Sequence, residues 1–84
     1  MDVANTTLAE RIARALAGLD HSANGDGVER SASVSVDETW PGYLDQADAI
    51  LRTIREPSAS MARIGDPQVW AAMVETAIAE RSSL

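Results

Sequence analysis

Residues 40–57 read WPGYLDQADAILRTIREP and predict an amphipathic helix of about four turns. Apolar side chains recur in it at spacings of three and four, which places them on one helical face: Trp40, Tyr43, Leu44, Ala47, Ile50, Leu51 and Ile54. Asp37 or Thr39 is the expected cap, and Pro41 falls in the first turn, where a missing N–H costs little. Pro57 requires the helix to end just before it.

A preceding helix is expected over residues 6–19. Thr7 and Glu10 form the pattern of a capping box, in which each side chain accepts a hydrogen bond from the other residue's free backbone N–H. One stripe of larger apolar side chains follows: Leu8, Ile12, Leu16 and Leu19. The alanines between them favour the helix and permit close approach of a neighbour. Gly18 and then Asp20 are expected to end the helix.

Two more helices are predicted towards the carboxyl end. The first is short, over residues 58–64, and Gly65 suits the left-handed position that closes such helices. Asp66 and Pro67 are an N-cap followed by proline at the first position of a last helix, which runs to about Arg81. These two helices are expected to direct the following side chains into the core: Met61, Ile64, Val69, Trp70, Met73, Val74, Ala77 and Ile78.

Residues 20–38 are rich in Gly, Asn, Asp and Ser, which are typical of turns. Valines and serines alternate over 31–36 with the period of a strand, but no other segment offers a partner strand. A long mobile loop, extended over 31–36, is therefore expected. The fold class that follows is all-α, a small three- to four-helix bundle with a long polar loop between its first two helices. It forms one domain over 1–84, with frayed ends at 1–5 and 82–84.

The composition excludes several classes of protein. The 84 residues contain no cysteine, so disulfide frameworks and cysteine zinc sites are ruled out. No apolar run approaches the roughly 18 residues of a membrane span, and the first residues lack the pattern of a secretory signal, so we expect a cytoplasmic protein. Thirteen acidic residues against seven arginines give a net charge of −6, which disfavours direct contact with nucleic acid.

A calcium-binding loop is the main metal hypothesis. The EF-hand loop places oxygen ligands at its first, third and fifth positions and glycine at its sixth. The oxygen-bearing candidates in this chain are Asp20, Ser22, Asn24 and Asp26. The pattern fails further on, because Gly27 stands at the usual branched apolar position and Ser31 replaces the bidentate glutamate. The alternative is an ordinary polar linker, and neither a metal nor another cofactor is predicted.

The sequence contains no motif that indicates an enzyme. It has no glycine-rich phosphate loop and no nucleophile elbow. His21 is the only histidine, and Asp45 and Asp48 lie on a helix face that faces solvent by periodicity rather than in a pocket. A helix-turn-helix in the last third is an alternative, but the expected recognition helix has no basic residue before Arg81.

Protein binding is the leading functional hypothesis. Trp40 and Trp70 begin apolar stripes, so each is either a core anchor or, if partly exposed, an interface anchor. The candidate partner-binding residues are Trp40, Tyr43, Asp45, Asp48 and Trp70. The net charge would steer the chain towards a protein partner with a basic surface. The alternative is a small structural component that self-assembles into a homo-oligomer.

Landmarks in the two helical regions also carry a family resemblance. They are Glu10–Leu16, Tyr43-Leu44, Ala47, Ile54–Pro57, Met61, Val69-Trp70, Met73-Val74 and Ala77. Over residues 8–19 and 40–80 the chain resembles small helical proteins encoded in phages and prophages of alphaproteobacteria. The resemblance implies no catalytic residues. It implies an accessory protein that binds a host or phage protein, for example an inhibitor of a host nucleic-acid machine such as an anti-CRISPR protein.

Overall fold

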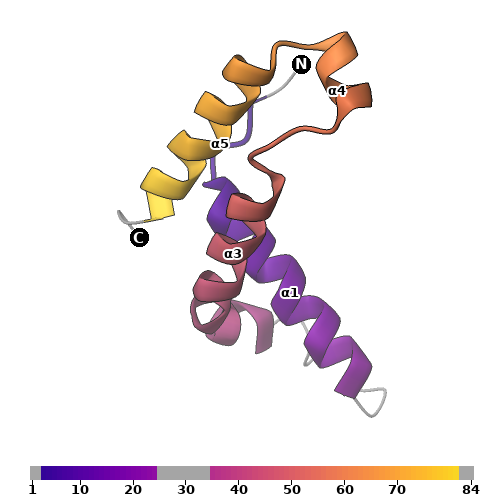
Figure 1. The fold of residues 1–84 in the computed structure, drawn as a ribbon. Coiled ribbons are helices and arrows are strands. Elements are labelled where there is room, and N and C mark those ends of the chain that lie inside the picture. The colour runs from indigo at the N-terminus through magenta and orange to yellow at the C-terminus, as the bar shows by residue number, and fades with distance from the viewer. Residues whose placement is uncertain (1–2, 25–34, 82–84) are drawn as a thin grey trace.

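The computed structural model describes residues 3–24 and 35–81, and no residue in these ranges lies in a strand. Three helices form the body of the fold, as Figure 1 shows: α1 (Leu8–Asn24), α3 (Leu44–Ile54) and α5 (Pro67–Arg81). Two shorter elements complete it, the 3₁₀ helix η1 (Trp40–Tyr43) and helix α4 (Ala59–Ile64). The predicted all-α fold is confirmed. No helix in the described ranges has the length and apolarity needed to cross a membrane.

Helix α1 is longer than the sequence predicts. Thr7 Oγ1 accepts the Glu10 N–H at 3.1 Å, which confirms the predicted start. The predicted end near Gly18 is wrong, because the helix continues to Asn24. The reason lies in tertiary contacts, since η1 packs along α1 and Val36 lies close to Gly18. Glycine in a helix interior costs about 1 kcal/mol relative to alanine, and packing of this kind outweighs that cost.

The predicted loop over 20–38 is therefore shorter than expected. Residues 20–24 belong to α1, and residues 35–39 are helical and lead into η1. The expected extended conformation over 31–36 is wrong at its last two residues. The rest of that loop, 25–34, lies outside the described residues.

Proline divides the helix that the sequence predicts as one. Pro41 has no N–H to give to the carbonyl four residues earlier, so the chain tightens into η1 before α3 begins at Leu44. Thr39 does not cap this helix, because its hydroxyl donates to the carbonyl of Ser35 instead. The end of α3 at Ile54, ahead of Pro57, is as predicted.

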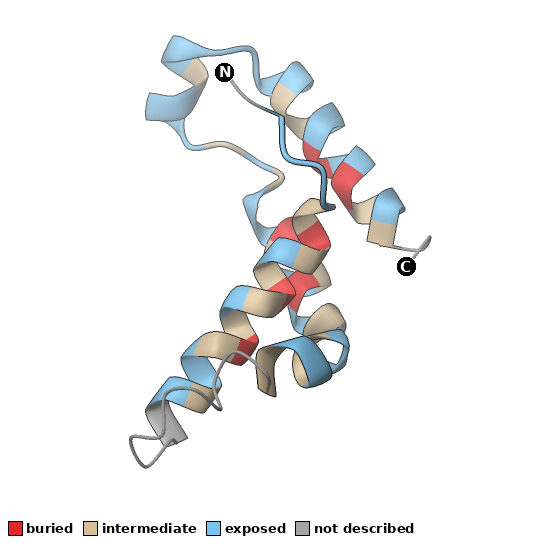
Figure 2. Ribbon diagram, turned by 180° about the vertical axis from the view of Figure 1, so that it is seen from behind, coloured by how far each residue is buried: buried red, intermediate tan, exposed pale blue. Residues whose placement is uncertain are grey.

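The core is small and consists mostly of alanine. Among the described residues, the buried apolar ones are Ala9, Ala13, Ala17, Ala47, Leu51, Val74 and Ala77, and Leu51 is the largest of them that is fully buried. Ala9, Leu51, Val74 and Ala77 form one cluster where α1, α3 and α5 face one another (Figure 2). Larger side chains surround them while partly exposed: Leu8, Ile12, Leu44, Trp70 and Ile78.

The buried stripe of α1 is its alanine stripe rather than its leucine stripe. Ala9, Ala13 and Ala17 recur every fourth residue and are completely buried, whereas Leu19 is 69% exposed. Small side chains let neighbouring backbones approach closely, so the alanine face makes the tightest contact and the larger apolar residues move to its edges. The predicted burial of Leu19 is therefore wrong.

Asp66 caps α5 as predicted, whereas Ser58, expected as the first residue of α4, is its N-cap. Ser58 Oγ accepts the Met61 N–H at 3.3 Å, and Asp66 Oδ1 accepts the Gln68 N–H at 2.9 Å. The connection between the helices differs from the prediction. Gly65 has φ −151° and ψ 175°, which is extended backbone open to any residue, and not the left-handed conformation expected of it.

Several residues expected in the core are exposed. Helix α4 has no buried residue, and among the described elements it packs extensively against none. Met61 is 43% exposed and Ile64 is 91% exposed, so both predictions of burial are wrong. In α5, Val74 and Ala77 are buried as predicted, but Val69 and Met73 are more than half exposed.

Replacing Leu51 by alanine is expected to lower the free energy of unfolding by about 3 kcal/mol, because it removes the largest fully buried side chain in the described part of the protein. Urea denaturation measures the change. Leu19→Ala, at an exposed apolar position on α1, is the matched control and should change stability by only about 0.5 kcal/mol. Similar losses for both variants would contradict this description of the core.

Gly18→Ala is expected to stabilise the protein by about 0.5–1 kcal/mol, since Gly18 lies in the interior of a helix. An added Cβ would lie 3.8 Å from Val36 Cγ2, which is an ordinary van der Waals contact. The same denaturation measurement tests this. A loss of stability would mean that α1 and the segment around Val36 lie closer together than the structure has them.

Candidate functional site

Apolar side chains are exposed on α4 and the first half of α5. Ile64 is 91% exposed, Met73 63% and Val69 55%. Together with Met61 and Trp70 they form what we call the α4–α5 apolar surface. Val69 and Met73 lie one turn apart on one side of α5, and Trp70 and Met73 are neighbours at a spacing of three. Trp70 also lines a groove together with Met61 and Ile64 of α4, so it connects the exposed side of α5 with α4.

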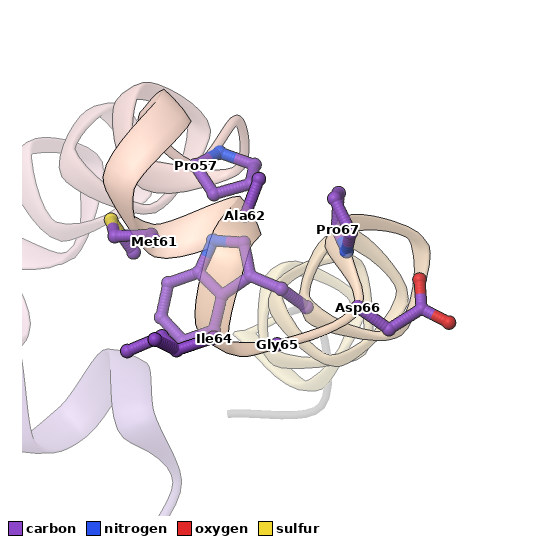
Figure 3. A pocket seen from close by; sticks show the side chains of 8 residues that line it. Pro57, Met61, Ala62, Ile64, Gly65, Asp66 and Pro67 are labelled. Carbon is purple, nitrogen blue, oxygen red and sulfur yellow. The ribbon is translucent and has the colours of Figure 1, made fainter.

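A groove of about 210 Å³ lies between α4 and the start of α5. Its walls are almost entirely apolar, and Figure 3 shows Met61, Ile64, Pro57 and Pro67 around it. Trp70 also lines the groove. The indole is held in place because its Nε1–H donates to the carbonyl of Ile54 at 2.7 Å, at the end of α3. The groove thus has one fixed aromatic wall and one wall from the loosely packed α4.

The charges around this surface nearly balance. Over residues 54–75 two arginines, Arg55 and Arg63, stand against three acids, of which Glu75 pairs with Arg55 at 3.9 Å. Arg63 donates to Ser60 Oγ at 3.2 Å within α4. A contact made on this surface would therefore depend on burial of apolar area rather than on charge.

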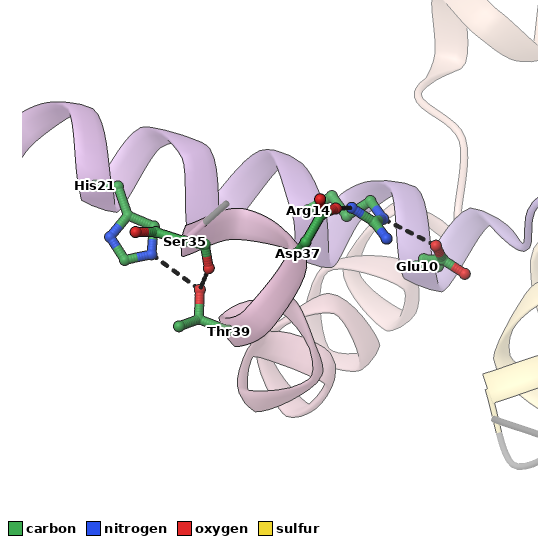
Figure 4. Close-up of polar contacts among 6 residues, drawn as sticks. All are labelled: Glu10, Arg14, His21, Ser35, Asp37 and Thr39. Atoms are coloured by element: carbon green, nitrogen blue, oxygen red, sulfur yellow. Dashed lines mark hydrogen bonds and ion pairs between the residues drawn. The ribbon is translucent and has the colours of Figure 1, made fainter. Parts of the chain in front are cut away.

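Away from this groove, a polar cluster lies between α1 and the helical residues 35–39, as Figure 4 shows. Arg14 on α1 donates to Asp37 at 2.6 Å and to Glu10 at 2.8 Å, and its guanidinium lies 5.2 Å from the centre of the Trp40 ring. Hydrogen bonds to the two carboxylates raise the pKa of Arg14 above its ordinary value. Trp40 is half-buried under this cation. These contacts join α1 to the helical residues before η1.

His21 belongs to the same end of the molecule. The Thr39 hydroxyl donates to the Ser35 carbonyl at 2.5 Å, so its oxygen accepts the Nε2–H of His21 at 2.9 Å. This arrangement assigns the proton to Nε2. It also uses the imidazole to hold the last turns of α1 against residues 35–39 (Figure 4).

The structure divides the predicted partner-binding residues into two groups. Trp40 and Tyr43 lie in η1, before the start of α3, whereas Trp70 lies beside its end. Asp45 and Asp48 each form an ion pair within the chain, with arginines 81 and 52. Their charges are thereby partly neutralised. Of the five candidates, only Trp70 belongs to the α4–α5 apolar surface.

The proposed calcium ligands do not form the expected loop. Asp20 and Ser22 lie within α1, where residues two apart are rotated by about 200° and point in different directions. Asp20 accepts the Tyr43 hydroxyl at 2.5 Å. Asn24 is the last residue of α1, and Asp26 lies outside the described residues. Within the described residues, no three His, Asp or Glu side chains gather in a way that could hold a metal ion.

Sequence periodicity assigned most of the α4–α5 apolar surface to the core. A different property of the α5 sequence indicates that this surface is exposed. Apolar residues occupy nearly the whole circumference of the helix, with Val69 and Met73 on one side and Val74 and Ile78 on another. A helix of that kind is normally covered on more than one side. The core of this chain covers one side only.

No known protein family matches this chain. The curated proteins and the solved structures likewise contain no match to it.

The contact between Tyr43 and Asp20 predicts an elevated tyrosine pKa. The carboxylate accepts the phenol hydrogen and so raises the pKa of Tyr43 above 10.0. Because the native state then holds this proton more tightly than the unfolded chain, the contact stabilises the fold fully below pH 10 and the stabilisation is lost as pH rises through the native pKa.

Tyr43 is the only tyrosine, so titration of phenolate absorbance reports it directly. Asp20→Ala should lower the midpoint towards the ordinary value. An unchanged midpoint would mean that the two side chains do not interact in solution.

Proposed function

We propose that this chain is a non-enzymatic protein-binding module that contacts its partner through the α4–α5 apolar surface. The proposal rests on the exposure of Ile64, Val69 and Met73 beside an apolar groove. Contiguous exposed apolar surface is uncommon on monomeric proteins and usually marks a contact with another molecule.

The chemistry of the groove supports a protein rather than a small polar ligand. Aromatic and methionine side chains are enriched at protein interfaces, and Trp70 offers a rigid anchor between Met61 and Met73. The groove itself presents little polar surface to fix the orientation of a polar ligand.

The net charge supports a partner with a basic surface. At −6 the chain attracts basic proteins over distances comparable to the Debye length, which raises the association rate more than the affinity. Four described arginines are occupied in ion pairs with acidic side chains of this chain. Exposed acids that take no part in those pairs include Glu38, Glu56 and Glu80.

A more specific form of the proposal follows the resemblance to phage-encoded proteins. The chain would then inhibit a host nucleic-acid machine by occupying a basic surface of one of its proteins. Expression of the chain in a host with an active defence system tests this form. Unchanged phage restriction would remove it without affecting the general proposal.

The general proposal predicts that substitutions on the surface abolish partner capture without unfolding the protein. Ile64→Glu and Met73→Glu place a charge at exposed positions, so folding should persist by circular dichroism. Leu19→Glu is the matched control, since Leu19 is 69% exposed on α1. Immobilised wild-type protein and each variant are incubated with host extract, and the retained proteins are identified by mass spectrometry.

We expect a protein retained by the wild type and by Leu19→Glu, and lost from Ile64→Glu and Met73→Glu. Retention of a basic partner should weaken as salt is added, because screening reduces the attraction. Equal retention by all four proteins would contradict the use of this surface.

A further inference from the structure

We infer that the groove between α4 and the start of α5 takes one uncharged aliphatic side chain of the partner protein, of the leucine or methionine kind. The inference rests on the proposed function, and it names the chemistry of the group that the partner places at this surface. Three features support it: the size of the groove, the hydrogen bonds that its donors already make, and the direction of its charged side chain.

The groove has room for one side chain but not for a larger molecule. Its volume is about 210 Å³. An enclosed apolar cavity of about 150 Å³ holds one benzene molecule, whereas pockets for drug-sized ligands and cofactors have volumes of about 300–1,000 Å³. A single aliphatic side chain is therefore an occupant of suitable size.

The backbone around the groove offers few hydrogen-bond donors. Pro57 and Pro67 have no N–H. The N–H groups of Met61 and Ala62 donate to the hydroxyl and to the carbonyl of Ser58, at 3.3 and 2.9 Å. A partner group that needs a donor, such as an amide oxygen or a carboxylate, would therefore lose its water here without a full replacement.

Trp70 contributes an apolar ring whose N–H is already used. The indole N–H donates to the Ile54 carbonyl at 2.7 Å, and the backbone N–H of Trp70 donates to the carbonyl of Asp66 at 3.0 Å. The bond to Ile54 fixes the ring, so the partner meets an aromatic wall that offers no donor. Trp70 thus makes the groove selective for apolar groups as well as supplying part of its surface.

The charge of the groove lining also favours an uncharged occupant. Asp66 is the only charged residue among those that line the groove, and Figure 3 shows its carboxylate pointing away from the other side chains. Its Oδ1 accepts the Gln68 N–H at 2.9 Å. An arginine or lysine placed in the groove would lose its water without gaining an opposite charge. We therefore expect the basic groups of the partner to contact acids elsewhere on the chain.

Binding of small model compounds to the full chain tests the inference, with the indole N–H resonance of Trp70 as the readout in NMR spectra. A spectrum of Trp70→Phe distinguishes this resonance from that of Trp40. N-acetyl-methioninamide and N-acetyl-norleucinamide should shift it with millimolar dissociation constants. Their polar counterparts of nearly the same size, N-acetyl-glutaminamide and N-acetyl-lysinamide, should bind at least about tenfold more weakly, because each would bury an amide or a charge.

A substitution in the wall of the groove locates the binding. Met61→Gln adds an amide at nearly constant size, and Met61 is 43% exposed, so folding should persist by circular dichroism. We expect this variant to bind N-acetyl-methioninamide at least about threefold more weakly. Leu19→Gln makes a similar change at an exposed position on α1 and should leave this binding unchanged.

Three results would overturn the inference: polar compounds that bind as tightly as the apolar ones, a Trp70 resonance that no apolar compound shifts, and binding that Met61→Gln leaves unchanged. The capture experiment then decides the proposed function separately. If capture is lost from Ile64→Glu and Met73→Glu but kept by Leu19→Glu, the inference fails and the proposed function stands. If all these proteins also retain the same partner equally, both fail.

Discussion

Leu51 connects the three helices that make up the body of this protein. Its side chain is completely buried and forms one cluster with Ala9 of α1 and with Val74 and Ala77 of α5. Burying a leucine contributes about 1.5–3 kcal/mol, a large share of what a domain of this size has available. The small residues around it matter equally, since they allow the helices to approach closely enough to enclose it. A larger residue at position 9 or 77 would separate the helices that it joins.

A core of this kind has a consequence for the rest of the chain. Because the enclosed volume is small, it has no room for all the large apolar side chains, and those of α4 and the outer side of α5 remain outside. Trp70 lies at the boundary, where it packs against the core, bonds to the carbonyl of Ile54 and lines the groove. The same limit on core size therefore explains both the marginal packing of α4 and the apolar surface available for binding.

Sequence patterns predicted local structure well and the choice of buried face less well. The caps at Thr7 and Asp66 depend on neighbouring residues alone, and both are observed. The end of α1 depends on distant contacts, so Gly18 misled the prediction. Periodicity identifies an apolar face but cannot decide between an alanine stripe and a leucine stripe, since that choice depends on how closely another helix approaches. For the same reason the surface around Met73 was assigned to the core.

Native-state hydrogen exchange resolved by residue tests the central claim, that α1, α3 and α5 share one core around Leu51 while α4 lies outside it. Amides near Leu51 in all three helices should exchange with one common free energy, that of global unfolding, whereas α4 amides should exchange much faster through local opening. Protection of α4 equal to that of α3, or independent opening of α5, would contradict the claim.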